Sequence, residues 1–203
     1  MIDFRVLQAL RLKGRARPAE IASAIGAAEP QVTASLSGLV AAGQAEEVNG
    51  RLKLTPAGRA ALAERLATER ADVDRAAVTA AYAEFDRHNS AFKQLVTDWQ
   101  LKDGATPNDH TDARYDAKIV ERLGELHAGF LPLLERIVFL APRLSHYPPR
   151  FSAALAAVRA GDQSWLARPL IDSYHTVWFE LHQDLMGLAG VRRTDEAAAG
   201  RAE

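Results

Sequence analysis

Apolar residues in the N-terminal part of the chain recur at helical spacing, and glycine or proline interrupts them. The first dozen residues predict a helix that Gly14 ends. Pro18 suits the first turn of a second helix, and Gly26 suits its left-handed cap. A third helix is expected over residues 30–42, ended by Gly43, with an inner face of Val32, Leu36 and Leu39. The pattern thus predicts three short helices joined by tight turns.

A two-stranded hairpin is expected next. Asn49 and Gly50 lie between the short segments 44–48 and 51–55, and a type I′ turn needs positive φ at both central residues. Alternation in the second segment separates an apolar face from a basic one, namely Leu52 and Leu54 against Arg51 and Lys53. Thr55 can then cap the following helix.

The remainder of the chain reads as helical and shows no second hairpin signal. Helices are expected over residues 56–70, 74–102 and 113–144, after Pro149 as far as Gly161, and over 163–189. The polar residues 103–112 form a loop in which Asp109 or Thr111 would cap the long helix, or which would cover a ligand. The fold class is therefore mainly α, with an N-terminal helix-and-hairpin domain and a C-terminal all-helical domain.

Several polar residues fall on the apolar faces of the predicted C-terminal helices, among aromatic residues, whereas Glu180 and Asp184 are expected to face away. A buried polar group is costly unless it is hydrogen-bonded. The inward groups can therefore form a ligand pocket, a metal site or a core network, and the sequence leaves these open. The candidate ligand-binding residues are His88, Asn89, Trp99, Arg122, His175, Trp178 and His182.

Metal binding is the weakest of these interpretations. His175 and His182 are seven residues apart, about 10.5 Å along a helix, so they cannot share one ion. A site would need one of them plus residues from elsewhere, such as Asp109, His110, Asp112 or Asp172. We expect no metal and no cofactor.

Composition narrows the function classes. The chain has 203 residues, 48% of them apolar, and no cysteine, which excludes disulfides, thiolate metal sites and cysteine nucleophiles. Its net charge is -1, but the charge is unevenly distributed. Residues 1–68 contain nine Lys or Arg and six Asp or Glu, whereas residues 69–203 contain 16 Lys or Arg and 20 Asp or Glu. A basic first part is a modest sign of nucleic-acid contact.

Other classes lack their signatures. The N-terminus has no apolar segment of a signal peptide, and no apolar run approaches the roughly 20 residues of a membrane span. We therefore expect a cytoplasmic protein without membrane contact. Gly-rich phosphate loops and the G-x-S-x-G and H-E-x-x-H motifs are missing, so we expect no enzyme.

Two motifs resemble a known family. Residues 20–39 (EIASAIGAAEPQVTASLSGL) resemble the helix-turn-helix of MarR-type and ArsR-type bacterial transcription regulators. The matching positions are Ala22, Gly26, Val32, Leu36 and Leu39. Residues 54–59 (LTPAGR) are similar to the LTxxGR that follows the wing in MarR-type proteins. The resemblance covers about a third of the chain and implies a winged helix-turn-helix.

The resemblance also implies how DNA would be bound. The third helix would enter the major groove with the exposed residues Gln31, Thr33, Ala34 and Ser37. Arg51 and Lys53 would lie on the wing, and Arg15 and Arg17 would flank the phosphate backbone. The sequence departs from the family because its recognition helix has no basic residue and carries Glu29 near its start. Binding should therefore be weak per subunit, depend on the wing, or rely on dimerisation.

The sequence predicts a DNA-binding domain over residues 1–68, a helical dimerisation and ligand-sensing domain over 69–191, and a disordered tail over 192–203. The expected function is transcription regulation by a homodimer that binds double-stranded DNA and senses an unknown small-molecule effector. The alternative is a winged-helix adaptor that docks a protein and lacks sequence-specific DNA binding.

Overall fold

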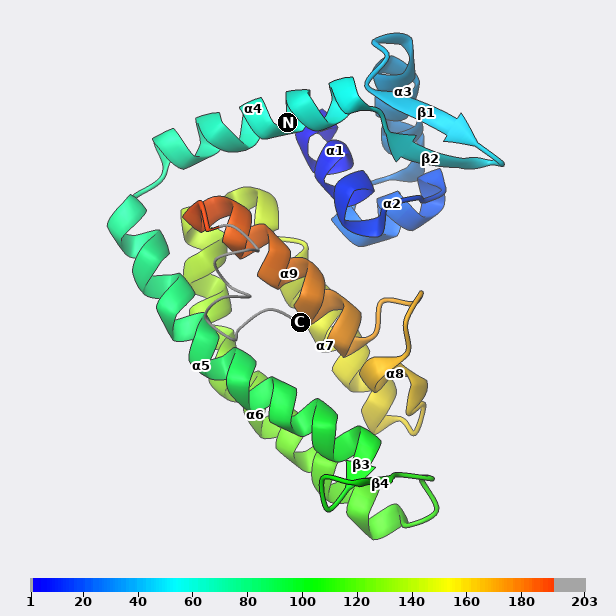
Figure 1. The fold of residues 1–203 in the computed structure, drawn as a ribbon, viewed down its shortest axis with the longest axis vertical. Helices are drawn as coiled ribbons and strands as arrows, with labels where there is room; N and C mark the ends of the chain where they lie inside the picture. The colour runs from blue at the N-terminus through cyan, green and yellow to red at the C-terminus, as the bar shows by residue number, and fades with distance from the viewer. Residues whose placement is uncertain (1, 192–203) are drawn as a thin grey trace. The chain divides into compact units, whose positions relative to one another are not determined.

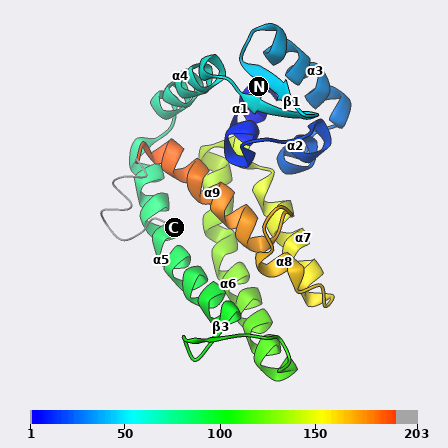
Figure 2. The ribbon, with the colours of Figure 1, turned by 45° about the vertical axis from the view of Figure 1, so that its right-hand side comes forward.

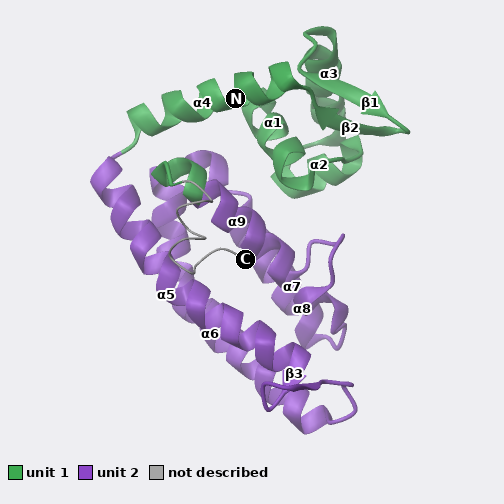
Figure 3. Cartoon of the chain, in the orientation of Figure 1, with its two compact units in different colours: residues 1–73, 186–203 green, residues 74–185 purple. Residues whose placement is uncertain are grey.

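A computed structural model of the chain describes residues 2–191, and these residues are mainly helical (Figure 1). They divide into two compact units (Figure 3). Unit 1 holds residues 2–73 and 186–191, and unit 2 holds residues 74–185. The predicted tail, residues 192–203, lies outside the described residues.

Unit 1 has the order of elements that the N-terminal pattern predicts. The elements are α1 (Ile2–Lys13), α2 (Pro18–Ile25), α3 (Glu29–Ala41), β1 (Ala45–Val48), β2 (Arg51–Leu54) and α4 (Pro56–Asp72). Gly26 ends α2 with a φ of 61°. Asn49 and Gly50 join the strands with φ values of 54° and 73°, and Thr55 caps α4. These local predictions are confirmed.

Strand β2 lies between two neighbours and organises the sheet of unit 1. It pairs antiparallel with β1, and Leu52 also exchanges hydrogen bonds of 2.8 and 3.0 Å with Ala16, in the segment between α1 and α2. The core beneath is aliphatic: Val6, Leu7, Leu10, Ile21, Ile25, Val32, Leu36, Leu39, Leu52, Leu54 and Leu62 are buried. This core holds α3 in place.

Unit 2 is built on two long helices that run side by side in opposite directions (Figures 1 and 2). These are α5 (Arg75–Gln100) and α6 (Ala113–Leu140), joined through β3 (Leu101–Lys102) and β4 (Thr106–Pro107). A 3-10 helix η1 (Pro142–Leu144), α7 (Tyr147–Arg159), α8 (Ser164–Ala167) and α9 (Tyr174–Ala189) follow. The last turn of α9 belongs to unit 1.

The loop between α5 and α6 corrects two predictions. It contains the short hairpin β3–β4, which pairs Leu101 with Pro107. Asp103 and Gly104 in its turn have φ values of 55° and 71°. This Asp-Gly pair is a hairpin signal, so the prediction that no second hairpin occurs was wrong. The N-cap of α6 is Asp112, which accepts hydrogen bonds from two amides of the first turn. Asp109 and Thr111 instead bond to each other.

The predicted helix boundaries near the C-terminus were also wrong. Helix α6 ends at Leu140, and Pro142 begins the separate 3-10 turn. The expected helix over residues 163–189 is two helices, with a break between Ala167 and Tyr174. Pro169 explains the break, because proline donates no backbone hydrogen bond and disfavours helical geometry in the preceding residue.

Candidate functional site

Helix α3 presents to the outside a polar face that carries no basic residue. It buries Val32, Leu36 and Leu39 in the core of unit 1. The Ser35 hydroxyl donates a 2.6 Å hydrogen bond to Asp3, which ties α3 to α1. The four predicted DNA-contacting side chains of this helix, Gln31, Thr33, Ala34 and Ser37, are all exposed. The helix is thus anchored on one side and open on the other.

The pairing of Ala16 with Leu52 gathers basic residues that the sequence keeps apart. Cross-strand neighbours share a face, and the antiparallel bridge places Arg15 beside Lys53 and Arg17 beside Arg51. Ala16 and Leu52 themselves point into the core. We call Arg15, Arg17, Arg51 and Lys53 the basic sheet face.

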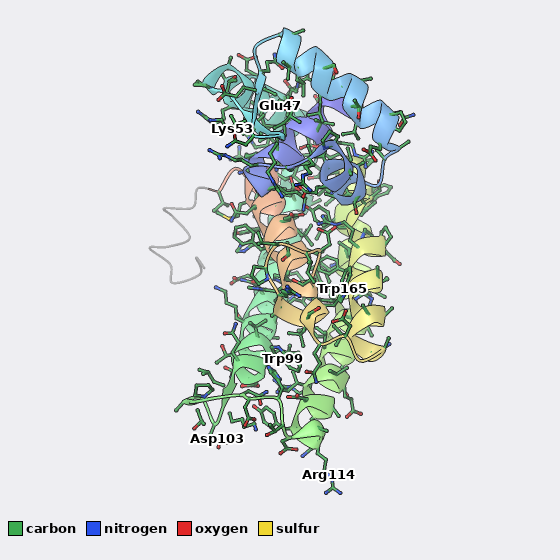
Figure 4. All side chains as sticks on the ribbon, turned by 90° about the vertical axis from the view of Figure 1, so that its right-hand side faces the viewer. Glu47, Lys53, Trp99, Asp103, Arg114 and Trp165 are labelled. Atoms are coloured by element: carbon green, nitrogen blue, oxygen red, sulfur yellow. The ribbon has the colours of Figure 1, made fainter. Side chains whose placement is uncertain are left out.

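Two members of the basic sheet face already have acidic partners. The Arg51 guanidinium contacts the Glu20 carboxylate at 3.1 and 3.2 Å, and Lys53 lies 3.0 Å from Glu46 on β1. The side chains of Arg51 and Glu20 are 40% and 39% exposed, so water screens the pair and it contributes at most about 1 kcal/mol. The hairpin that carries Lys53 also carries a second exposed carboxylate, that of Glu47 on β1 (Figure 4).

The LTPAGR segment has a structural role of its own. The Thr55 hydroxyl donates to the Gly43 carbonyl at 2.6 Å and accepts from the Gly58 amide at 3.1 Å. A Cβ on Gly58 would overlap the carbonyl oxygen of Gln44. Arg59 donates to the Leu54 carbonyl at 3.0 Å. The motif therefore locks the start of α4 onto the turn that precedes β1.

In unit 2, five of the seven predicted ligand-binding residues meet at one aromatic cluster, which consists of Phe85, Phe92, Phe130, Phe151, Tyr174 and Trp178. Trp178 belongs to the cluster, and its Nε1 donates a 2.9 Å hydrogen bond to the buried Asn89. This pair satisfies its polar groups inside the core, as the core-network interpretation expects.

Four histidines border the aromatic cluster. The buried His127, which the sequence analysis did not single out, has its Nδ1 3.2 Å from the Tyr174 hydroxyl. The rings of the half-buried His88 and His175 lie 5.5 Å from Phe130 and 5.9 Å from Phe92. His182 is buried, with its ring 5.3 Å from Phe85. Burial is the main reason that the pKa of His88 lies below its ordinary value. The cluster is therefore a buried aromatic core bordered by imidazoles, of which His88 favours its neutral form.

Arg122 and Trp99 do not join this cluster. Arg122 is exposed and pairs with Asp98 at 2.7 Å, so the prediction of an inward Arg122 was wrong. Its long side chain reaches solvent from the border of the apolar stripe. Trp99 is buried near the loop that carries Asp103 (Figure 4), and its ring lies 4.4 Å from the ring of His110.

The loop between α5 and α6 is held by a buried carboxylate. Asp116 accepts hydrogen bonds from Asn108 at 2.9 Å and from Gln163 at 3.2 Å, and His110 Nδ1 lies 3.1 Å from it. These contacts tie residues 108–110 to α6 and to Gln163 at the start of α8, so we assign them to loop anchoring.

A buried ion network in unit 2 was missed by the sequence analysis. Its members are Arg143, Tyr147, Arg150, Asp172, Glu180 and Asp184. Arg150 lies 2.7 Å from Glu180, and Asp184 accepts bonds of 2.6 Å from Arg143 and from Tyr147.

Glu180 and Asp184 were expected to face away from the core, and that expectation was wrong, since they are 4% and 1% exposed. Helix α9 packs its aromatic side on the cluster and its other side on residues of η1 and α7. Buried carboxylates on that side are tolerated because cations and a hydroxyl face them.

Two further observations bear on function classes. Among the described residues, no three His, Asp or Glu side chains are grouped so that they could hold a metal ion. Within residues 2–191, no helix is both long enough and apolar enough to span a membrane.

Comparisons of the chain with protein-family models, with curated proteins and with solved structures give no match.

Proposed function

We propose that the protein is a DNA-binding transcription regulator in which unit 1 acts as a winged helix-turn-helix. The observation that carries the proposal is the basic sheet face, which sets Arg15 and Arg17 beside Arg51 and Lys53. Four cations on one small sheet suit the phosphate backbone, whose neutralisation releases counterions.

In this proposal, α3 enters the major groove and the β1–β2 hairpin acts as the wing. The core of unit 1 fixes α3 through its buried face, so the outward residues are held for base contact. The basic sheet face contacts phosphates and provides most of the affinity, because α3 carries no basic side chain.

The ion pairs on the wing set the strength of binding. Arg51 must exchange Glu20 for a phosphate, and Lys53 must exchange Glu46. Both pairs are partly exposed, so each exchange costs little. Replacing Glu20 by Gln keeps an acceptor for the Arg17 amide and releases Arg51. We expect Glu20→Gln to tighten DNA binding by up to about fivefold.

Glu64→Gln is the matched control for that variant, because it removes the same charge from an exposed position on α4. The two duplex affinities are measured by fluorescence anisotropy at one salt concentration. Equal affinities of the two variants would show that the Glu20–Arg51 pair does not limit contact with DNA.

The experiment that tests the proposal is a salt titration of duplex binding. A fluorescent duplex from the gene's own upstream region is compared with a scrambled duplex between about 50 and 200 mM salt. We expect preference for the upstream duplex and a slope of log affinity against log salt that decreases by about 1.8 per protomer in the Arg51→Gln, Lys53→Gln variant.

The control for the titration is the Arg87→Gln, Lys118→Gln variant, which removes two exposed charges from unit 2. It should keep the wild-type slope. An unchanged slope after neutralising Arg51 and Lys53 would overturn the proposed role of the wing.

We further propose that unit 2 mediates homodimerisation and binds an apolar or aromatic effector beside the aromatic cluster. Such a ligand would contact the half-buried His88 and His175. It can shift DNA affinity only if it binds the two states of the dimer differently.

A Trp99→Phe, Trp165→Phe variant retains Trp178 as its one tryptophan. The fluorescence of Trp178 then reports binding in a screen of small aromatic compounds. If His175→Ala lowers stability without altering any ligand response, the effector role is wrong.

The second candidate is a protein-docking adaptor. It is favoured by the absence of basic residues from α3 and by the carboxylates that already pair with Arg51 and Lys53. Absence of any preference for the upstream duplex at low salt would support this candidate over the regulator.

A further inference from the structure

The outward face of α3 has a definite chemistry. Its exposed side chains include one amide, Gln31, the hydroxyls of Thr33 and Ser37, and the methyl groups of Thr33 and Ala34. Its only charged residue is Glu29, at the first position of the helix. Ser35 is turned inward and bonds to Asp3, so it is not part of this face.

Base pairs in the major groove differ in the partners they require. Guanine offers two acceptors, which Arg or Lys reads best, whereas adenine offers an acceptor and a donor that match the amide of Gln. Thymine adds a 5-methyl group, which packs against the methyl groups of Ala and Thr. Gln31, Thr33 and Ala34 have the groups for adenine and thymine, and the face lacks the cations for guanine. Glu29, which can accept from the amino group of cytosine, lies at the first position of the helix and suits only the border of the half-site.

Arg15, Arg17, Arg51 and Lys53 do not alter this conclusion. All four lie on the basic sheet face, outside α3, where the proposed function assigns them to phosphates. Phosphate contacts position a protein on DNA and carry no direct base information. Discrimination between base pairs in the major groove must therefore come from the side chains of α3 itself.

We propose that α3 reads a half-site of A·T pairs, in which Gln31 bonds to the N6 and N7 atoms of an adenine and the Thr33 and Ala34 methyl groups contact thymine methyls. The inference rests on the proposed function and adds the class of sequence that is recognised. It assigns specificity to Gln31 and Thr33, and affinity to the basic sheet face.

The first experiment selects duplexes from a random pool with the full-length protein. We expect A·T pairs at the centre of each enriched half-site. Analogues then replace single bases in the selected duplex: 7-deazaadenine removes the N7 acceptor, and deoxyuridine removes the thymine methyl without changing the pairing.

Variants of α3 identify which residue reads which group. At one adenine, 7-deazaadenine should weaken wild-type binding on the order of tenfold and should add no further loss in Gln31→Ala. At a neighbouring thymine, deoxyuridine should weaken the wild type severalfold but not Thr33→Ser, which keeps the hydroxyl and loses the methyl. Gln100→Ala, which removes an exposed amide from α5, should behave as the wild type.

The outcomes separate the two proposals. Enrichment of G·C pairs at the half-site centre, or equal losses from 7-deazaadenine in the wild type and in Gln31→Ala, would overturn the assignment while leaving DNA binding intact. Failure to enrich any duplex, even at low salt, would overturn both the assignment and the proposed function.

Discussion

Replacing Asp184 by Asn tests whether the buried ion network of unit 2 stabilises the fold through its charges. Asp184 is 1% exposed and accepts 2.6 Å hydrogen bonds from Arg143 and Tyr147. The amide of Asn has almost the same size but removes the charge that faces Arg143, whose side chain is 7% exposed. Removing one partner of a buried ion pair costs about 3–5 kcal/mol.

We expect a loss near 3 kcal/mol in the free energy of unfolding, the lower end of that range, because the amide oxygen of Asn can still accept one bond. Asp98→Asn is the matched control. It removes the same charge from the pair with Arg122, whose N–O distance is 2.7 Å and whose side chains are 46% and 26% exposed. The control should cost less than about 1 kcal/mol.

Urea unfolding followed by circular dichroism measures both variants.

The pH dependence of stability gives a second check. Burial alone would raise the pKa of Asp184. The Arg143 charge and the Tyr147 hydroxyl outweigh burial and hold this pKa below its ordinary value. A depressed carboxyl pKa contributes stability above about pH 4, and this stability is lost as pH falls through the folded-state pKa. Asp184→Asn should therefore reduce the loss of unfolding free energy that occurs as pH falls below about 4. Equal costs for the two substitutions would refute the reasoning.

Two further predictions concern a glycine and two histidines. Gly58→Ala should destabilise unit 1 by about 1–3 kcal/mol, because the added methyl group meets the Gln44 carbonyl. Gly38→Ala on α3 has free space around its methyl group and should stabilise the helix by up to about 1 kcal/mol. Thermal unfolding compares the two variants, and equal shifts in Tm would contradict the close approach of Gly58 to Gln44. Burial is the main reason that His88 and His127 have pKa values below the ordinary one, so unit 2 should be fully stable above about pH 6.5 and lose stability as pH falls below it. Urea titrations from pH 7.5 to 5.5 check this sign, and an unchanged slope in the His88→Gln, His127→Gln variant would count against it.

The local structure of unit 1 could be predicted from the sequence because short-range backbone constraints dominate it. Gly26, Asn49 and Gly50 adopt the positive φ values that their turns require, and Thr55 caps the helix that follows. Each feature depends on a few neighbouring residues and on steric rules that hold in any fold. The exposure of Gln31, Thr33, Ala34 and Ser37 likewise follows from the helical period and from one buried face.

Only the tertiary structure decided which distant residues come together. The bridge between Ala16 and Leu52 places Arg15 and Arg17 beside β2, although more than thirty residues separate them from that strand in the sequence. Helical periodicity assumes that a helix buries one face, but α9 is enclosed on two sides, so Glu180 and Asp184 lie inside with Arg150 and Arg143. A carboxylate can be buried only where a cation or another hydrogen-bond donor faces it, and here that partner is supplied by another element of the fold, which the periodicity of a single helix cannot reveal.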